Sequence, residues 1–415
     1  MLFLEFGAWG AYLTSMGSYL ATIGLGPKIW LFFAMQGVVS IFMPAIVGII
    51  ADKYIPAQKT LSLCQLIAGL FMILCGVYCA STPQPGFGIL FTLYSISIAF
   101  YMPTIGLSNS VSYKELEKVG MDPVKDFPPI RIFGTIGFIC AMLFVNFMKD
   151  GNGVQFQSSY AQFFVSGILS LILAGYALTM TNCPVNKGQK GQSLGQALGL
   201  DAFQLFKRKE MALFFIFSML LGASLQITNG YANTYITSFK DIPEYANTWG
   251  ANNANALISL SQISETLCIL LIPIFMKKFG IKGVMSIAMF AWVFRFGFFG
   301  AGNPGSGVWM FILSCLVYGV AFDFFNISGS LYVNENTDKK IQSSAQGLFM
   351  LMTNGLGATI GTFAAGRVVN AVVYNAANPS WSKAWFIFAA YALVVGILFV
   401  IFFKVPKKDN AEVKA

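Results

Sequence analysis

The stretch VWMFILSCLVYGVAFDFFNISGSLY, from Val308 to Tyr332, indicates the class of fold, because it is a long apolar run that contains one acid, Asp323. About 20 apolar residues are enough for a helix to cross a bilayer. No complementary charge lies near Asp323 in the sequence, and an acid at the centre of a spanning helix costs roughly 3 kcal/mol. Such residues usually face a bundle interior or a water-filled cavity and serve function. The alternative is that Asp323 only hydrogen-bonds a neighbouring helix.

The composition of the whole chain also indicates a membrane protein. Its 415 residues are 56% hydrophobic and 10% charged, whereas globular proteins have roughly a quarter charged residues. Histidine is absent, which excludes histidine-based zinc sites, triads and proton relays. The seven cysteines lie mostly within apolar runs without paired spacing, so we expect them to pack, not to form disulfides. We expect neither a metal nor a cofactor.

Twelve apolar runs are long enough to be membrane crossings. They span about residues 2–23, 29–50, 61–80, 88–110, 128–147, 163–181, 211–237, 254–276, 283–301, 308–332, 345–371 and 384–403. The first run begins almost at Met1, without the basic region and cleavage site of a signal peptide, so we expect it to be retained. The missing basic leader also suggests that the native start lies upstream.

Lysine and arginine predict the orientation of these crossings. Nineteen of the 26 basic residues fall on one side of the predicted membrane, and Lys28, Lys149, Lys240 and Lys383 fall on the other. This bias places both termini in the cytoplasm. The net charge of +9 therefore reflects topology, and we expect no nucleic-acid partner.

The chain divides into two six-helix halves, residues 1–181 and 211–403, joined by a cytoplasmic linker at 182–210 and followed by a cytoplasmic tail at 404–415. AFYMPTIGLSNSVSY, from Ala99 to Tyr113, weakly resembles AFDFFNISGSLY, from Ala321 to Tyr332, at the corresponding position of the second half. Two parallel halves with a site between them are typical of major facilitator transporters. The linker lacks the GxxxxGK[ST] phosphate loop, so nothing favours an ATP-driven pump. The predicted fold is thus all-α, with twelve transmembrane helices.

The loop after the second crossing, GIIADKY, resembles the G-x-x-x-D-R/K signature of the major facilitator superfamily through Gly48, Asp52 and Lys53. We expect the glycine to let two helices approach closely. Asp52 could bond a helix N-terminus or a basic residue when the halves close on that side, which would make the loop a gate. An ordinary charged turn between helices is equally compatible with the spacing.

Four predicted helices carry polar or aromatic residues on one face, as expected for a cavity. The candidates are Arg131, Thr135 and Phe138 in the fifth, Gln226 and Asn229 in the seventh, Gln262 and Glu265 in the eighth, and Tyr318, Phe322 and Asp323 in the tenth. A nucleoside base could stack on the rings and pair its edge with the amides, while the ribose hydroxyls suit acids, arginine or threonine. A sugar would also use amides and acids, so this set does not separate the two.

Other charged residues within helices leave alternatives open. Arg131 could instead extend its side chain to the membrane interface, because Asp126-Phe127-Pro128-Pro129 is typical of a helix start. Glu5 could pair with Arg131 or lie at the cytoplasmic edge. Arg367 is expected to anchor the outer end of its helix, and the role of Arg295 stays undecided.

Six stretches resemble the NupG-type nucleoside:proton symporters of the major facilitator superfamily, and the similarity runs through nearly the whole chain. They are DFPPIRIFGTIGF (126–138), LGLDAFQLFK (198–207), FFIFSMLLGASLQITN (214–229), SQISETL (261–267), YGVAFDFFNISGS (318–330) and SSAQGLFMLMTNGLG (343–357). The resemblance implies a nucleoside site between the halves that is built from the candidates above, with Asp323 at the helix-ten acid implicated in transport. Glu5 departs from the family, in which this position carries glutamine.

Together with these residues, the resemblance implies uptake of purine and pyrimidine nucleosides with protons across the bacterial inner membrane, by alternating access. The proton step rests on Asp323 and Glu265, since an acid that moves between apolar and charge-paired surroundings can load and release a proton. The alternative is a related transporter for another polar solute, such as xanthosine only or a sugar. No nucleophile–base pair or metal cluster favours an enzyme, and a channel would not be driven uphill by a pH gradient. The two halves supply both sides of the site, so a monomer is expected to function.

Overall fold

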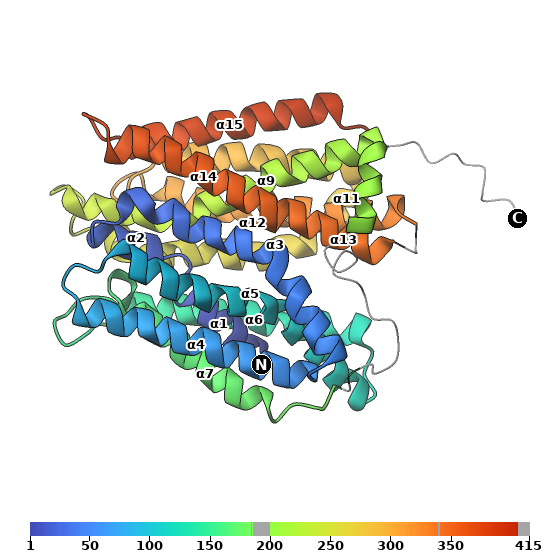
Figure 1. Cartoon of the computed structure of the whole chain (residues 1–415). Coiled ribbons are helices and arrows are strands. Elements are labelled where there is room, and N and C mark those ends of the chain that lie inside the picture. The colour runs from blue at the N-terminus through green and yellow to red at the C-terminus, as the bar shows by residue number, and fades with distance from the viewer. Residues whose placement is uncertain (184, 186–199, 339–340, 406–415) are drawn as a thin grey trace, which may run out of the picture.

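The structure is a computed structural model that describes residues 1–183, 185, 200–338 and 341–405. The helices run side by side along one direction, and the chain crosses the bundle repeatedly (Figure 1). Most of the predicted linker and residues 406–415 of the predicted tail lie outside the described residues. We call the helices α1 to α7 the N-terminal half and the helices α9 to α15 the C-terminal half.

Each half is built from long apolar helices joined by short turns. The N-terminal half contains α1 (Leu2–Gly10), α2 (Met16–Thr22), α3 (Ile29–Lys53), α4 (Ala57–Ser81), α5 (Phe87–Lys118), α6 (Pro123–Phe147) and α7 (Ala161–Ala177), with short 3-10 turns at Gly26–Lys28 and Phe156–Ser158. The C-terminal half contains α9 (Lys209–Ser238), α10 (Trp249–Asn252), α11 (Ala254–Ala301), α12 (Val308–Asn336), α13 (Gln342–Met350), α14 (Ala358–Val369) and α15 (Trp381–Phe402), with 3-10 turns at Leu200–Lys207 and Phe239–Asp241. Two π-helical segments, η5 (Leu351–Gly357) and η6 (Asn370–Tyr374), continue α13 and α14.

Nine helices in the described part of the chain are long and apolar enough to cross a membrane. The predicted first crossing is divided into α1 and α2 by a turn at residues 11–15, and α7 is shorter, with 17 residues. The predicted eighth and ninth crossings lie in one continuous assignment, α11, on either side of Gly280. Gly280 has a φ of 66°, a left-handed conformation that glycine adopts without steric cost, so the chain bends there.

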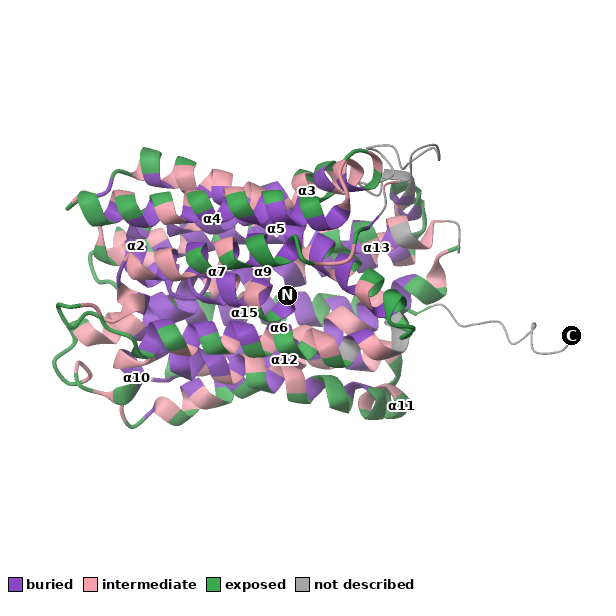
Figure 2. Ribbon diagram, turned by 90° about the horizontal axis from the view of Figure 1, so that it is seen from below, coloured by how far each residue is buried: buried purple, intermediate pink, exposed green. Residues whose placement is uncertain are grey.

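The outward faces of the helices are apolar, whereas in a soluble protein the outward faces are mostly polar. Buried residues fill the interior and exposed ones follow the outer faces of the helices (Figure 2). Leu270 and Ile274 on α11 are 70% and 62% exposed, and they lie one helical turn apart on the same face. Faces of this kind are stable against lipid, so the chain is an integral membrane protein.

Polar side chains join the two halves at the end of the bundle opposite the linker. Thr14 donates to Asn255 at 2.9 Å and Asn146 donates to Asn253 at 2.9 Å. Gln157 and Asn146 also accept the backbone N–H groups of Asn255 and Ala256, each at 3.2 Å. These N–H groups belong to the first turn of α11, where no carbonyl of the helix itself can accept them. In the described part of the chain, all side-chain hydrogen bonds between the halves lie toward this end.

Candidate functional site

The N-terminal side of the candidate site is formed where α6 packs against α1. The two helices touch closely, because a side chain at Gly137 would collide with the backbone of Phe3. This contact places the guanidinium of Arg131 3.8 Å from the ring centroid of Phe6. Phe138 is buried with its ring edge toward Trp9, the ring centroids lying 6.3 Å apart. Arg131 is thus held against an aromatic ring and is not extended freely to the interface.

Glu5 lies next to this site as a fully buried acid with its own partners. Its carboxylate accepts hydrogen bonds from Gln65 at 2.9 Å and from Thr104 at 2.6 Å. The hydroxyl of Tyr101 donates to the backbone carbonyl of Glu5 at 2.5 Å. The interpretation of Glu5 as an edge residue is wrong, because α4 and α5 enclose it. Its charge interacts with that of Arg131 without forming an ion pair within 4 Å.

The C-terminal side presents a pair of stacked rings on α12. Tyr318 and Phe322 have ring centroids 5.9 Å apart at an interplanar angle of 11°. Behind them, the guanidinium of Arg295 lies 4.4 Å from the Tyr318 ring and donates to the carbonyl of Ser314 at 2.8 Å and to the hydroxyl of Ser261 at 3.3 Å. Arg295 is 2% exposed. This arrangement gives Arg295 a structural role, in which it supports the Tyr318 ring.

Two acids lie close to these rings. The charge of Glu265, on α11, interacts with Arg131 across the interface of the halves and with Asp323 and Tyr318 on α12. Asp323 is only 4% exposed, and its Oδ2 atom has no hydrogen-bond partner among the described residues. A buried carboxylate oxygen without a partner is costly, so it marks a group that serves function or takes a ligand or a proton.

The remaining polar candidates lie on the helices where they were predicted. Gln226 on α9 is buried, and its Oε1 atom has no hydrogen-bond partner in the described part of the chain. Thr135, Asn229 and Gln262 are partly exposed. The charge of Glu265 thus interacts with those of Arg131 and Asp323, and Gln262 is hydrogen-bonded to Tyr318. Thr135, Gln226 and Asn229 lie on the neighbouring helices α6 and α9.

The signature loop differs from its prediction in one respect. A side chain at Gly48 would have no heavy atom within 4 Å, so the expectation that this glycine permits a close helix approach is wrong in this arrangement. The reason is that α3 ends at Lys53 without a neighbouring helix packed against Gly48. Asp52 is exposed and Lys53 half-buried.

Sequence reasoning missed the residues that enclose Glu5. Gln65, Tyr101 and Thr104 are polar residues within long apolar runs. Because buried polar groups need hydrogen-bond partners, their position could have indicated that they bind another polar group inside the bundle. The described residues contain no group of three or more side chains that could hold a metal ion.

Comparisons with known proteins agree with this geometry. A family model described as "Nucleoside H+ symporter" matches residues 1–408. The nucleoside permease NupG of Escherichia coli K12 is 44% identical over 97% of this chain and 94% of its own length. The xanthosine permease of the same organism is 43% identical over 97% and 94%, respectively. A crystal structure of NupG superposes with a TM-score of 0.87 at 44% identity, covering 98% of each chain. The chain therefore belongs to the nucleoside:H+ symporter family.

Proposed function

We propose that this protein takes up purine and pyrimidine nucleosides with protons across the bacterial inner membrane. It would do so as a monomer with twelve transmembrane helices in two six-helix halves and with both termini in the cytoplasm. The observation that carries this proposal is the interaction of the Arg131 charge on one half with that of Glu265 on the other, where Glu265 also interacts with Asp323 and Tyr318, the latter stacked on Phe322. The family and its relatives, which are permeases and not enzymes, support the same conclusion.

The residues present suit the two parts of a nucleoside. The base is a flat aromatic system that can stack on Tyr318 or Phe322, and its edge mixes donors and acceptors that an amide such as Gln226 can match. The ribose hydroxyls can donate to Glu265 and accept from Arg131. A ligand held by both halves would favour the arrangement in which they close around it.

The proton step uses the two acids of the C-terminal half. Asp323 has a buried oxygen without a partner, and Glu265 interacts with both Asp323 and Arg131. Two acids this close do not readily carry negative charges together, so one of them is the natural place for a proton. When the halves move, the distance between Arg131 and Glu265 changes, and the proton affinity of the two acids Glu265 and Asp323 changes with it. This links substrate binding at Arg131 to proton release.

Alternating access requires that one end of the bundle close while the other opens. The hydrogen bonds through Asn146, Gln157 and Asn255 close the end opposite the linker. At the other end, neither Asp52 nor Lys53 forms an ion pair with another residue in the described part of the chain. We propose that Gly48, Asp52 and Lys53 form a gate that engages the C-terminal half when the linker end closes.

Two related activities would use the same site. The first is transport of xanthosine alone, because the xanthosine permease is 43% identical to this chain. The identity of this chain to the nucleoside permease NupG is equally high, at 44%, so identity does not favour this alternative. A sugar transporter would leave the stacked Tyr318–Phe322 pair without a base to bind.

The test is uptake of radiolabelled uridine into proteoliposomes, with and without an inward proton gradient. We expect accumulation driven by the gradient and competition by adenosine but not by ribose. Asp323→Asn should abolish gradient-driven accumulation while uridine binding persists, and Glu265→Gln should impair both. Asp241→Asn, which changes an exposed acid remote from the site, serves as the matched control. Unchanged uptake in both Asp323→Asn and Glu265→Gln would refute the proton step, and competition by xanthosine alone would restrict the substrate.

A further inference from the structure

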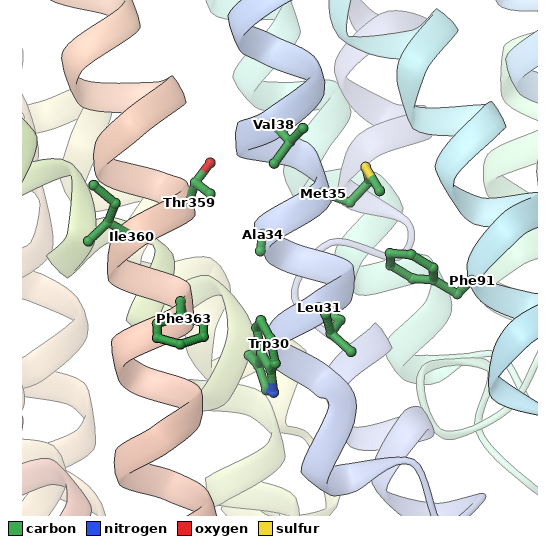
Figure 3. A pocket seen from close by; sticks show the side chains of 9 residues that line it. All are labelled: Trp30, Leu31, Ala34, Met35, Val38, Phe91, Thr359, Ile360 and Phe363. Carbon is green, nitrogen blue, oxygen red and sulfur yellow. The ribbon is translucent and has the colours of Figure 1, made fainter.

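A groove opens on the side of the bundle between α3 and α14, remote from the candidate site. Its volume is about 410 Å³, and its lining includes Trp30, Ala34, Val38, Phe91, Ile360 and Phe363 (Figure 3). The one hydroxyl in the lining, that of Thr359, is already satisfied because it donates to the carbonyl of Gly355 at 2.8 Å. Apart from the indole N–H of Trp30, the lining has no polar side-chain group left to bind a ligand, so the groove suits a hydrocarbon.

The groove exists because α3 and α14 touch closely at two points and separate between them. A side chain at Gly37 would collide with Thr359, and one at Gly366 would collide with Trp30. Between these contacts the side chain of Ile360 is 52% exposed. Since this side of the bundle consists of membrane-spanning helices, the medium that enters the gap is lipid.

Two cations lie at one end of the groove. The guanidinium of Arg367 lies 5.1 Å from the ring centroid of Phe363, a groove residue. The ammonium of Lys28 lies 4.4 Å from the Phe87 ring, which stacks on Phe91, another groove residue, at 5.0 Å. Both cations are exposed, and no carboxylate among the described residues pairs with either of them.

We propose that this groove binds one phospholipid, with an acyl chain between α3 and α14 and the headgroup phosphate at Arg367 and Lys28. Within a bilayer, burying a chain against apolar helices brings no hydrophobic gain by itself, since lipid tails are equally apolar. The preference for this place comes from filling a gap whose walls would otherwise lack contacts. Charge-assisted hydrogen bonds from the two cations to the phosphate add to it.

The lipid would also act on the transport cycle, because the two walls of the groove belong to different halves. α3 moves with the N-terminal half and α14 with the C-terminal half. An acyl chain that fits the groove in the present arrangement of the halves binds more weakly when the halves have rotated, because the groove then changes its shape. Lipid occupancy therefore favours the state that is closed opposite the linker.

Native mass spectrometry of the full chain in detergent, titrated with palmitoyl-oleoyl phosphatidylglycerol, tests the site. We expect one tightly held lipid, and about tenfold weaker retention in the double variant Lys28→Gln/Arg367→Gln. Ala34→Phe, which fills the groove, should have a similar effect. Lys383→Gln, which removes another exposed lysine from the same end of the bundle, should retain the lipid. Equal retention by the wild type and the double variant would overturn the proposal.

Fluorescence quenching provides a second, independent measurement. Trp30 lines the groove, whereas Trp309 is 52% exposed elsewhere on the bundle and reports on ordinary surrounding lipid. Comparison of the wild type with Trp30→Phe and Trp309→Phe isolates the signal of each. Phosphatidylglycerol with brominated acyl chains should quench Trp30 at lower lipid fractions than Trp309, and the double charge variant should remove this difference. Identical quenching curves would exclude a lipid site at Trp30, whatever the transport activity of the protein.

Discussion

Replacement of Thr14 by valine should loosen the closed end of the bundle by a calculable amount. The Thr14 hydroxyl donates to Asn255 at 2.9 Å between the halves, and both side chains are buried. Asn255 Oδ1 also accepts from Asn233 at 2.8 Å, so valine leaves no buried acceptor without a partner. The loss is then the net value of one hydrogen bond, about 1 kcal/mol. Because this bond exists only while the halves meet, the ratio of open to closed states should rise about fivefold.

Hydrogen–deuterium exchange in lipid nanodiscs measures this ratio directly. The amide protons of Asn255 and Ala256 are held by acceptors of the other half, Gln157 and Asn146, so they exchange only when the halves separate at this end. Their exchange rates should increase about fivefold in Thr14→Val, in proportion to the open population. Thr228→Val is the control, because that buried hydroxyl donates only within α9, to Ser224 at 3.1 Å. Equal exchange rates in the two variants would refute the assignment of Thr14 to a closing contact.

Three further substitutions test the residues around the site. Arg295→Met removes the guanidinium packed at 4.4 Å on Tyr318. It should weaken uridine binding about tenfold, measured by calorimetry, because a desolvated cation–π contact and hydrogen bonds to a charged group are lost. Affinity equal to wild type would contradict a supporting role. Glu5→Ala removes the acceptor of the hydrogen bonds from Gln65 and Thr104. These two donors keep other acceptors, the Thr104 hydroxyl and the Tyr101 carbonyl, so the loss should be about 2 kcal/mol, the net value of two hydrogen bonds. Glu5→Gln keeps an acceptor oxygen and should unfold at nearly the wild-type temperature; equal melting of the two variants would argue against the network. Gly137→Val should lower the melting temperature by forcing the backbone of Phe3 away, at a cost of about 1–3 kcal/mol, and unchanged thermal unfolding would show that α1 and α6 can separate freely.

The predicted apolar runs agree with the positions of several helices to within a few residues. The run 308–332 lies within α12 (Val308–Asn336) and the run 211–237 within α9 (Lys209–Ser238). This agreement has a simple cause, since a bilayer requires each spanning segment to satisfy its own backbone hydrogen bonds and to be apolar over its whole length. The polar faces of α6, α9, α11 and α12 could be identified for the same reason, because a polar residue within a long apolar run is conspicuous.

The sequence by itself determined that the chain is a helical membrane protein, and its spacing indicated which helix faces carry polar groups. Only the tertiary structure decided which of these groups meet. Glu5 receives Gln65 and Thr104 from two other helices, Thr14 reaches Asn255 in the other half, and Arg295 supports Tyr318 instead of binding an acid. Periodicity along one helix reports which of its faces is polar, but it contains no information about which neighbouring helix packs there or at what height. Partners that lie tens to hundreds of residues apart are chosen by the packing of the whole bundle.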